Sequence, residues 1–234
     1  MNRRNLVAAV VMFSLTTLTL LSGCTHSIDV SYQADSARLA NASALEQVAV
    51  GVAKFEDKRA WVEAGEPKTE SFVSQAGPHK FGLTYLEKDY YPVKDLIQDV
   101  LIKELTLAGI KAKALDFVLS KSSAKGAGDL GKDAGDYQVG GQILAFDYTT
   151  QAGMWTVTSR RTAIINMNLY RRGEAQPFFE QPISEMDTKE YAMGVAHSVN
   201  VETLVREVFR KVAHQIVQRT AEKITLPPQV VLDK

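Results

Sequence analysis

Two stretches of the chain carry apolar residues at helical spacing. The first follows Pro92, and Gly109 stands behind it where a left-handed C-terminal cap belongs. The second begins at Asn200, a candidate N-cap, and runs to about Lys223 before two prolines stop it. The apolar positions are Val93, Leu96, Ile97, Val100, Leu101, Leu105 and Ala108 in the first stretch, and Val201, Val205, Val208, Phe209, Val212 and Ile216 in the second. The spacing predicts two amphipathic helices.

Other stretches have the alternation and β-branched content of strands. Valines alternate with small residues at 47–55, and a further apolar stretch follows the first helix at 113–119. Two long stretches at 137–149 and 154–171 are separated by a short connection, which favours an antiparallel hairpin. A turn at Arg172-Gly173-Glu174 predicts a returning strand over 177–183.

The order strand, helix, strand, three antiparallel strands, helix predicts an α/β (α+β) fold. We expect a two-layer sandwich in which a mixed, largely antiparallel sheet carries two main helices on one face. Of the 234 residues, 45% are hydrophobic, which is enough for one core of this kind. A single domain is expected at 46–226, followed by a C-terminal tail at 227–234.

The N-terminal residues have the composition of an export signal. Arg3 and Arg4 precede an apolar stretch that ends in small residues, and this stretch is shorter than a membrane-spanning helix requires. The ending Leu21-Ser22-Gly23-Cys24 resembles the bacterial lipobox, in which the cysteine becomes the lipidated first residue of the mature chain. Residues 1–23 are therefore expected to form a lipoprotein signal peptide.

Cys24 is the only cysteine, so no disulfide forms within one chain. A thiolate is a strong nucleophile, suited to forming a thioether with a diacylglyceryl group. The lipobox resemblance implies a covalent diacylglycerol and an N-acyl chain (palmitate or similar) on Cys24, and several chains together hold a protein stably on a membrane. Thr25, where inner-membrane lipoproteins tend to have Asp, favours the outer membrane, with the domain in the periplasm.

The segment 24–45 is rich in Ser, Ala and polar residues and has no sustained period. It is interpreted as a lipidated N-terminus followed by a flexible tether. Extended at about 3.3 Å per residue, the tether would span roughly 60 Å. The domain is then expected to stand away from the lipid surface.

The segment 56–91 is unusually aromatic for a connection between a strand and a helix. A long excursion of this kind is usually functional or has structure of its own. It is either a short hairpin around Lys80–Leu86 whose aromatic residues complete the core, or a flap that binds a partner or covers a ligand. The candidate partner-binding residues are Trp61, Phe72, Phe81, Tyr85, Tyr90 and Tyr91.

Matches to enzyme motifs lack the context that their chemistry needs. Gly126-Ala-Gly128-Asp-Leu-Gly131 fits a dinucleotide fingerprint, but no good helix start follows it to receive a pyrophosphate. Ser122-Ser-Ala-Lys125 fits a serine-nucleophile pattern, but its partner motifs Ser-Asp-Asn and Lys-Thr-Gly do not occur. Both are interpreted as polar loop, and the protein is expected not to be an enzyme.

Metal and cofactor sites are not predicted either. The acids Asp129, Asp133 and Asp136 lack the alternate spacing of a calcium loop. The histidines at 26, 79, 197 and 214 have no mutual zinc-ligand spacing and are interpreted as structural. Apart from the acyl groups on Cys24, no cofactor is expected.

The balance of charged residues does not predict nucleic acid as a partner. Lys plus Arg and Asp plus Glu each number 27, so no overall charge attracts nucleic acid. Arg160, Arg161, Arg171 and Arg172 cluster toward the ends of one predicted strand. They are interpreted as solvated strand ends that prevent edge pairing, with contacts to an anionic surface as the alternative.

The layout as a whole resembles the YajG-type lipoproteins. The likeness rests on the lipobox, a strand ending in Phe55-Glu56-Asp57-Lys58-Arg59, the helix that ends in Ala108-Gly109, and Asp136-Tyr137 opening a Gly-containing strand. Similar layouts occur in ABC-transport auxiliary lipoproteins and, more distantly, in TolB amino-terminal-like domains. The resemblance implies a fold and a compartment, and it supplies no catalytic residues.

The leading hypothesis is a lipid-anchored periplasmic accessory protein that binds another component of the cell envelope or of a transport machine. The alternative is a carrier that shelters an amphipathic small molecule or lipid between the sheet and its helices. The sequence indicates no oligomeric state.

Overall fold

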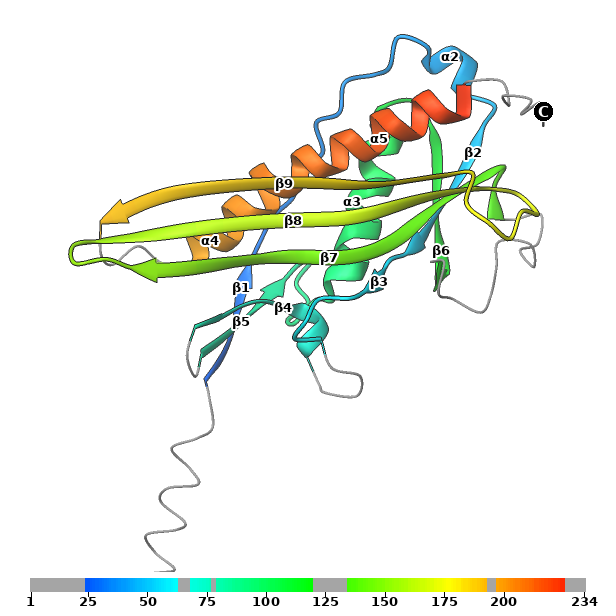
Figure 1. Cartoon of the computed structure of the whole chain (residues 1–234). Helices are drawn as coiled ribbons and strands as arrows, with labels where there is room; N and C mark the ends of the chain where they lie inside the picture. The colour runs from blue at the N-terminus through cyan, green and yellow to red at the C-terminus, as the bar shows by residue number, and fades with distance from the viewer. Residues whose placement is uncertain (1–23, 63–67, 77–78, 120–133, 193–196, 226–234) are drawn as a thin grey trace, which may run out of the picture.

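The computed structural model describes residues 24–62, 68–76, 79–119, 134–192 and 197–225 (Figure 1). The strands are β1 (Thr25–Asp29), β2 (Ala49–Lys54), β3 (Glu56–Asp57), β4 (Phe72–Ala76), β5 (His79–Thr84), β6 (Lys111–Val118), β7 (Tyr137–Ala152), β8 (Thr156–Arg171) and β9 (Phe179–Ala192). The helices are α2 (Ala42–Leu45), the 3-10 turn η1 (Thr69–Ser71), α3 (Val93–Leu107), α4 (His197–Thr203), the π-helical turn η4 (Leu204–Phe209) and α5 (Arg210–Thr225).

The larger sheet has the strand order β6-β2-β7-β8-β9, with β3 paired to β7 at one side. Strand β2 runs parallel to both β6 and β7, whereas β7, β8 and β9 are antiparallel. The predicted mixed, largely antiparallel sheet is confirmed. The β7–β8 ladder continues from Tyr137 opposite Arg171 to Ala152 opposite Val157, so these strands extend well beyond the helices.

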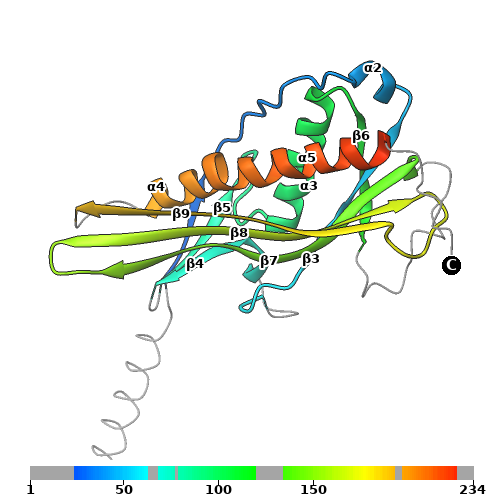
Figure 2. The same ribbon diagram turned by 45° about the horizontal axis from the view of Figure 1, so that its top comes forward.

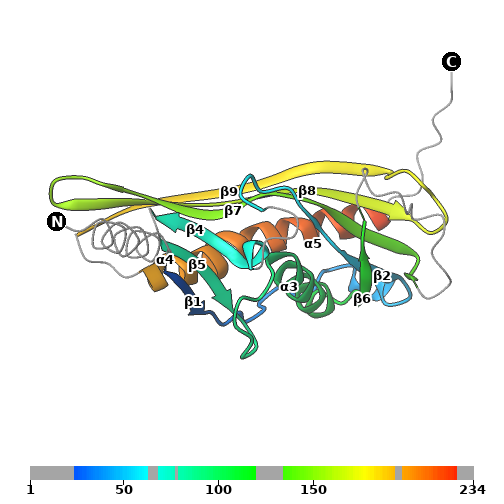
Figure 3. The same ribbon diagram turned by 90° about the horizontal axis from the view of Figure 1, so that it is seen from below.

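Helices α3 and α5 cover the same face of this sheet, as predicted (Figures 2 and 3). Their apolar stripes meet the inward side chains of β7 and β8 in one continuous core. Phe146 on β7 packs edge-on against Phe209 at 5.2 Å between ring centroids. Gly109, with φ of +94°, ends α3 as the sequence predicts, and a Cβ there would lie 2.7 Å from the Cβ of Ala42.

The second helix departs from the prediction at its start. It begins at His197, so Asn200 lies inside α4 and is not an N-cap. The Asn200 side chain is buried, and its oxygen accepts a 2.7 Å hydrogen bond from the Ser159 hydroxyl on β8. A residue type that favours helix ends is here retained within the helix because it pairs with a buried polar group of the sheet.

A smaller sheet has the order β1-β5-β4; the hairpin interpretation anticipates its β4–β5 pair, but the sequence did not predict that β1 joins it. Strands β4 and β5 form an antiparallel hairpin, and β1 pairs in parallel with β5 from Thr25 opposite Lys80 to Asp29 opposite Thr84. It lies on the helix side of the larger sheet, beside α3 (Figure 3). Strand β1 and the packed residues after it are not the flexible tether expected over 24–45.

The chain after β1 is fixed to the helices by a buried carboxylate. Val30 and Tyr32 are buried, and Glu104 on α3 is fully buried. Glu104 accepts hydrogen bonds from the Tyr32 hydroxyl and from the Ser36 backbone N–H, the latter at 2.9 Å. Hydrogen bonds to a charged acceptor are the stronger kind, so these contacts hold the N-terminal segment onto the domain.

A buried ion pair joins the two sheets. Arg59 and Asp57 contact at 2.6 Å with side chains only 1% and 4% exposed. The Arg59 guanidinium also donates to the backbone carbonyls of Glu70 and Phe72, at the start of the β4–β5 hairpin. The sequence motif Glu56-Asp57-Lys58-Arg59 therefore positions the hairpin against β3 and β7.

We expect Tyr32→Phe to reduce the free energy of unfolding by roughly 1–3 kcal/mol, because it leaves the buried Glu104 carboxylate with one donor fewer. The matched control is Tyr91→Phe, which removes a 2.8 Å hydrogen bond to the half-exposed Asp99, where water can replace the hydroxyl. Urea denaturation followed by circular dichroism measures both. Equal losses of unfolding free energy in the two variants would show that the Tyr32–Glu104 hydrogen bond contributes no more to stability than the half-exposed Tyr91–Asp99 hydrogen bond.

Candidate functional site: the N-terminal end of the domain

Cys24 is the first described residue and is exposed. Strand β1 begins at the next residue, and the Cys24 carbonyl accepts a 3.0 Å hydrogen bond from the backbone N–H of Lys80. The other lipobox positions, Leu21, Ser22 and Gly23, lie outside the described residues. Any group attached to Cys24 is thus joined to the smaller sheet with no free length of chain between them.

The six candidate partner-binding aromatics divide into two sets. Phe72, Phe81 and Tyr85 are buried, so they complete the core as the hairpin interpretation expects. Trp61, Tyr90 and Tyr91 are half-buried at the surface. The predicted hairpin lies slightly earlier than 80–86, because β4 and β5 together cover 72–84. The buried three are not available to a partner.

The loop from Tyr85 to Tyr91 has an unusual backbone. Leu86, Glu87 and Tyr90 have φ of 51°, 61° and 55°, in the left-handed region that normally costs a non-glycine residue about 1–2 kcal/mol. Leu86 is 55% exposed. Tyr90 packs back toward β1, where its hydroxyl lies 3.3 Å from the Thr25 hydroxyl. Backbone strain of this kind is concentrated at functional sites. Within the segment 56–91, this loop is therefore the strongest candidate for a partner-binding surface.

Histidines from three distant segments meet beside Cys24, which the sequence did not predict. His26 on β1 stacks on Phe81 at 5.6 Å between ring centroids, and His197 on α4 stacks on the same ring at 4.1 Å. The His26 and His79 rings lie 5.8 Å apart. Nδ1 of His197 lies 2.9 Å from the Tyr148 hydroxyl on β7. This histidine cluster connects the smaller sheet to the larger one.

Burial, followed by the neighbouring His79 and His26, lowers the pKa of His197 below its ordinary value of 6.5. The neutral ring is therefore the form that suits the folded domain. In the unfolded chain the ring takes up a proton at higher pH than in the folded one.

Two groups of side chains bring metal-ligand atoms together. The ligand atoms of Cys24, His26 and His79 lie within 4.8 Å of one another, as do those of Asp35, Glu104 and His214. A lipidated Cys24 has no thiolate to offer, so acylation and metal binding at the first group exclude each other. In the second group Glu104 already accepts hydrogen bonds from Tyr32 and Ser36, and Nε2 of His214 lies 2.9 Å from Asp35.

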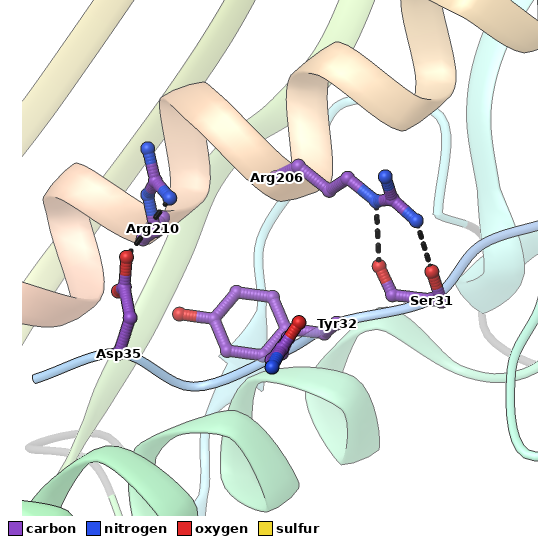
Figure 4. A pocket seen from close by; sticks show the side chains of 6 residues that line it. Ser31, Tyr32, Asp35, Arg206 and Arg210 are labelled. Atoms are coloured by element: carbon purple, nitrogen blue, oxygen red, sulfur yellow. Dashed lines mark hydrogen bonds and ion pairs between the residues drawn. The ribbon is translucent and has the colours of Figure 1, made fainter.

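A pocket of about 370 Å³ lies where the N-terminal segment crosses η4 and α5 (Figure 4). Arg206 donates to the Ser31 carbonyl at 3.1 Å, and Arg210 donates to Asp35 at 3.0 Å. The pocket is lined by Ser31, Tyr32, Gln33, Asp35, Arg206 and Arg210. Polar and charged side chains line it together with the Tyr32 ring, and it lies against the N-terminal segment, so it is not the predominantly apolar cavity between sheet and helices that the carrier hypothesis describes.

Arg161 departs from the interpretation of the arginine cluster as solvated strand ends, whereas Arg172, just after β8, is exposed as that interpretation expects. Arg161 is fully buried on a strand with neighbours on both sides, so it does not protect a sheet edge. It forms a 2.6 Å ion pair with Asp187 on β9, and its guanidinium donates to the Tyr191 hydroxyl and to Asn200. Its sequence neighbour Arg160 is exposed. Arg161 therefore fixes α4 against the sheet.

No family model and no curated protein matches the chain. Among solved structures, a Xanthomonas campestris protein of the DUF330 family is similar at a TM-score of 0.46 and 12% identity, over 84% of this chain and 94% of that one. A Neisseria meningitidis lipoprotein has a TM-score of 0.35 and 11% identity, over 76% and 97% of the two chains. A minor lipoprotein of Acinetobacter baumannii has 0.30 and 13%, over 75% and 91%. The YajG-type resemblance stays a prediction.

We expect acid to destabilise the domain through His197. Because its pKa is lowered in the folded state, its contribution to stability is fully present above pH 6.5 and is lost as the pH falls through the folded-state pKa. Melting temperatures of the wild type and of His197→Gln, measured at pH values on both sides of 6.5, should diverge in slope, with the variant flatter. Parallel curves would contradict the assignment.

Proposed function

We propose that the protein is a lipid-anchored accessory protein of the bacterial cell envelope, whose domain lies in the periplasm at the outer membrane and binds another envelope or transport component. The observation that carries the proposal is Cys24. It is the only cysteine, it ends a lipobox-like sequence, and in the folded chain it is exposed at the start of the first strand. An enzyme attaching acyl groups would meet no steric barrier there from the domain.

The membrane connection is proposed to be covalent lipid. Among the residues that the structure describes, no helix is both long and apolar enough to cross a bilayer. Two or more acyl chains, each methylene worth about 0.8 kcal/mol on burial, suffice for stable attachment. The position of Thr25 supports the outer rather than the inner membrane as the destination.

A binding role, rather than catalysis, is proposed for the domain. The buried charged groups Arg59 and Glu104 make their contacts within the chain and hold segments together. The partner is proposed to contact the Tyr85–Tyr91 loop, because its strained backbone presents Leu86 to solvent next to β1. The half-buried Tyr90 on the same loop belongs to a residue type that is enriched among binding hot spots, and Leu86 adds exposed apolar area beside it.

Cys24→Ser should release the protein from the membrane. We expect the wild type to sediment with outer-membrane vesicles and to carry the added mass of its acyl groups, whereas the variant remains in the soluble periplasmic extract. Fractionation followed by intact-mass measurement checks both. A variant that is cleaved after Gly23 and still sediments with membranes would exclude the lipid anchor.

The partner surface is tested by photo-crosslinking from Leu86 in intact cells. We expect a crosslinker at position 86 to capture one envelope protein reproducibly. The control is a crosslinker at Leu107 on α3, which is similarly exposed at 47% but lies outside the loop. Leu86→Gln should abolish co-purification of the captured protein, and Leu107→Gln should not. Equal capture from both positions, or none from 86, would contradict the assignment.

A further inference from the structure

The turn between β7 and β8 exposes two large apolar side chains at its tip. Met154 and Trp155 are 81% and 78% exposed, more than any other large hydrophobic residue among those described. From Tyr148 to Ser159 the sequence contains no Asp, Glu, Lys or Arg. Asp147 and Arg160 bound this stretch, so the turn and the strand ends next to it carry no charged residue of β7 or β8.

The hairpin that presents these residues is well ordered by its pairing. The Gly153 N–H donates to the Thr156 carbonyl at 2.7 Å and closes the turn. Below it, Ala152 pairs with Val157, and β9 continues alongside as far as Ala192 opposite Thr156. Three paired strands therefore support the tip, so Trp155 occupies a defined position with respect to the domain.

That position is at the same end of the molecule as Cys24. Figures 1 and 3 place both the β7–β8 turn and the start of β1 at the end opposite α2. The two are connected through Phe81 on β5, which contacts His26 on β1 and lies 6.3 Å from Tyr148 on β7 between ring centroids. At about 3.3 Å per residue, the hairpin reaches roughly 20 Å beyond Tyr148.

We propose that the β7–β8 tip, Met154 and Trp155, inserts into the interfacial layer of the bilayer to which Cys24 is anchored. This rests on the proposed lipid anchor. Because β1 begins directly after Cys24, acylation holds this end of the domain at the lipid surface. Tryptophan favours the headgroup region, where its ring is buried and its N–H stays hydrated. The lack of charge from Tyr148 to Ser159 lowers the cost of entering that layer for the tip itself, and the nearest charges on β9, Lys189 and Glu190, lie opposite Ser159 and Thr158 below it.

The test couples the exposed Cys24 thiol of the mature chain to a maleimide-headgroup phospholipid in phosphatidylcholine vesicles, so it does not depend on natural acylation. Trp61→Phe leaves Trp155 as the only tryptophan. We expect its emission to shift to the blue and to lose most of its intensity when the vesicles contain brominated phosphatidylcholine. The companion Trp155→Phe, in which only Trp61 remains, should lose little.

The control attaches the opposite end of the domain to the vesicle. In Cys24→Ser with Asn41→Cys, the exposed position 41 next to α2 is coupled instead, and Trp155 should keep the emission of a water-exposed ring. Unquenched Trp155 in the Cys24-coupled protein would overturn the proposal, including the case in which its emission shifts only when solubilised envelope proteins are added. Failure of the lipid anchor is recognised separately, as a native protein whose mass lacks acyl groups.

Discussion

The pairing of β1 with β5, reinforced by the Glu104 carboxylate, is the constraint on which the arrangement of this molecule depends. It brings the chain that begins at Cys24 onto the domain and continues it past Val30 and Tyr32 to α3. Burying a carboxylate without hydrogen-bond donors costs folding free energy. The Tyr32 hydroxyl and the Ser36 N–H therefore offset the burial cost of Glu104 as well as attaching the N-terminal segment to α3. Without them the buried Glu104 side chain would keep, among the described residues, only a 3.4 Å contact from the Asp35 N–H and the His214 ring 3.6 Å away.

This constraint defines one end of the domain. The smaller sheet, the histidine cluster around Phe81 and the β7–β8 tip all lie on the side where the chain begins. Under the proposed lipid anchor, a chain with no free residues between Cys24 and β1 would restrict the orientation of the domain at the membrane. Its orientation would then decide which surface residues can contact lipid or a membrane-embedded partner. On a freely tethered domain, all surface residues would be equivalent in this respect.

The larger sheet and its helices could be predicted because their periodicity is long and regular. The alternation over 154–171 and the stripe from Val93 to Ala108 identify β8 and α3 directly. Strand β1 could not be recognised, because five residues with one apolar side chain pair only when β5 is already in place. The histidine cluster could not be predicted because His26, His79 and His197 lie far apart along the sequence. Asn200 was wrongly predicted as an N-cap because the sequence does not distinguish an asparagine that caps a helix from one that is buried and accepts a hydrogen bond from Ser159.

The central claim is that no flexible tether separates Cys24 from the fold, and amide hydrogen exchange on the chain that begins at Cys24 tests it most directly. The backbone N–H of Val30 donates to Thr84, and that of Ser36 donates to Glu104. The account predicts that both exchange slowly, at rates comparable to those of the β5 amides. Exchange of residues 26–36 at the rate of an unstructured chain, with β5 still protected, would contradict it.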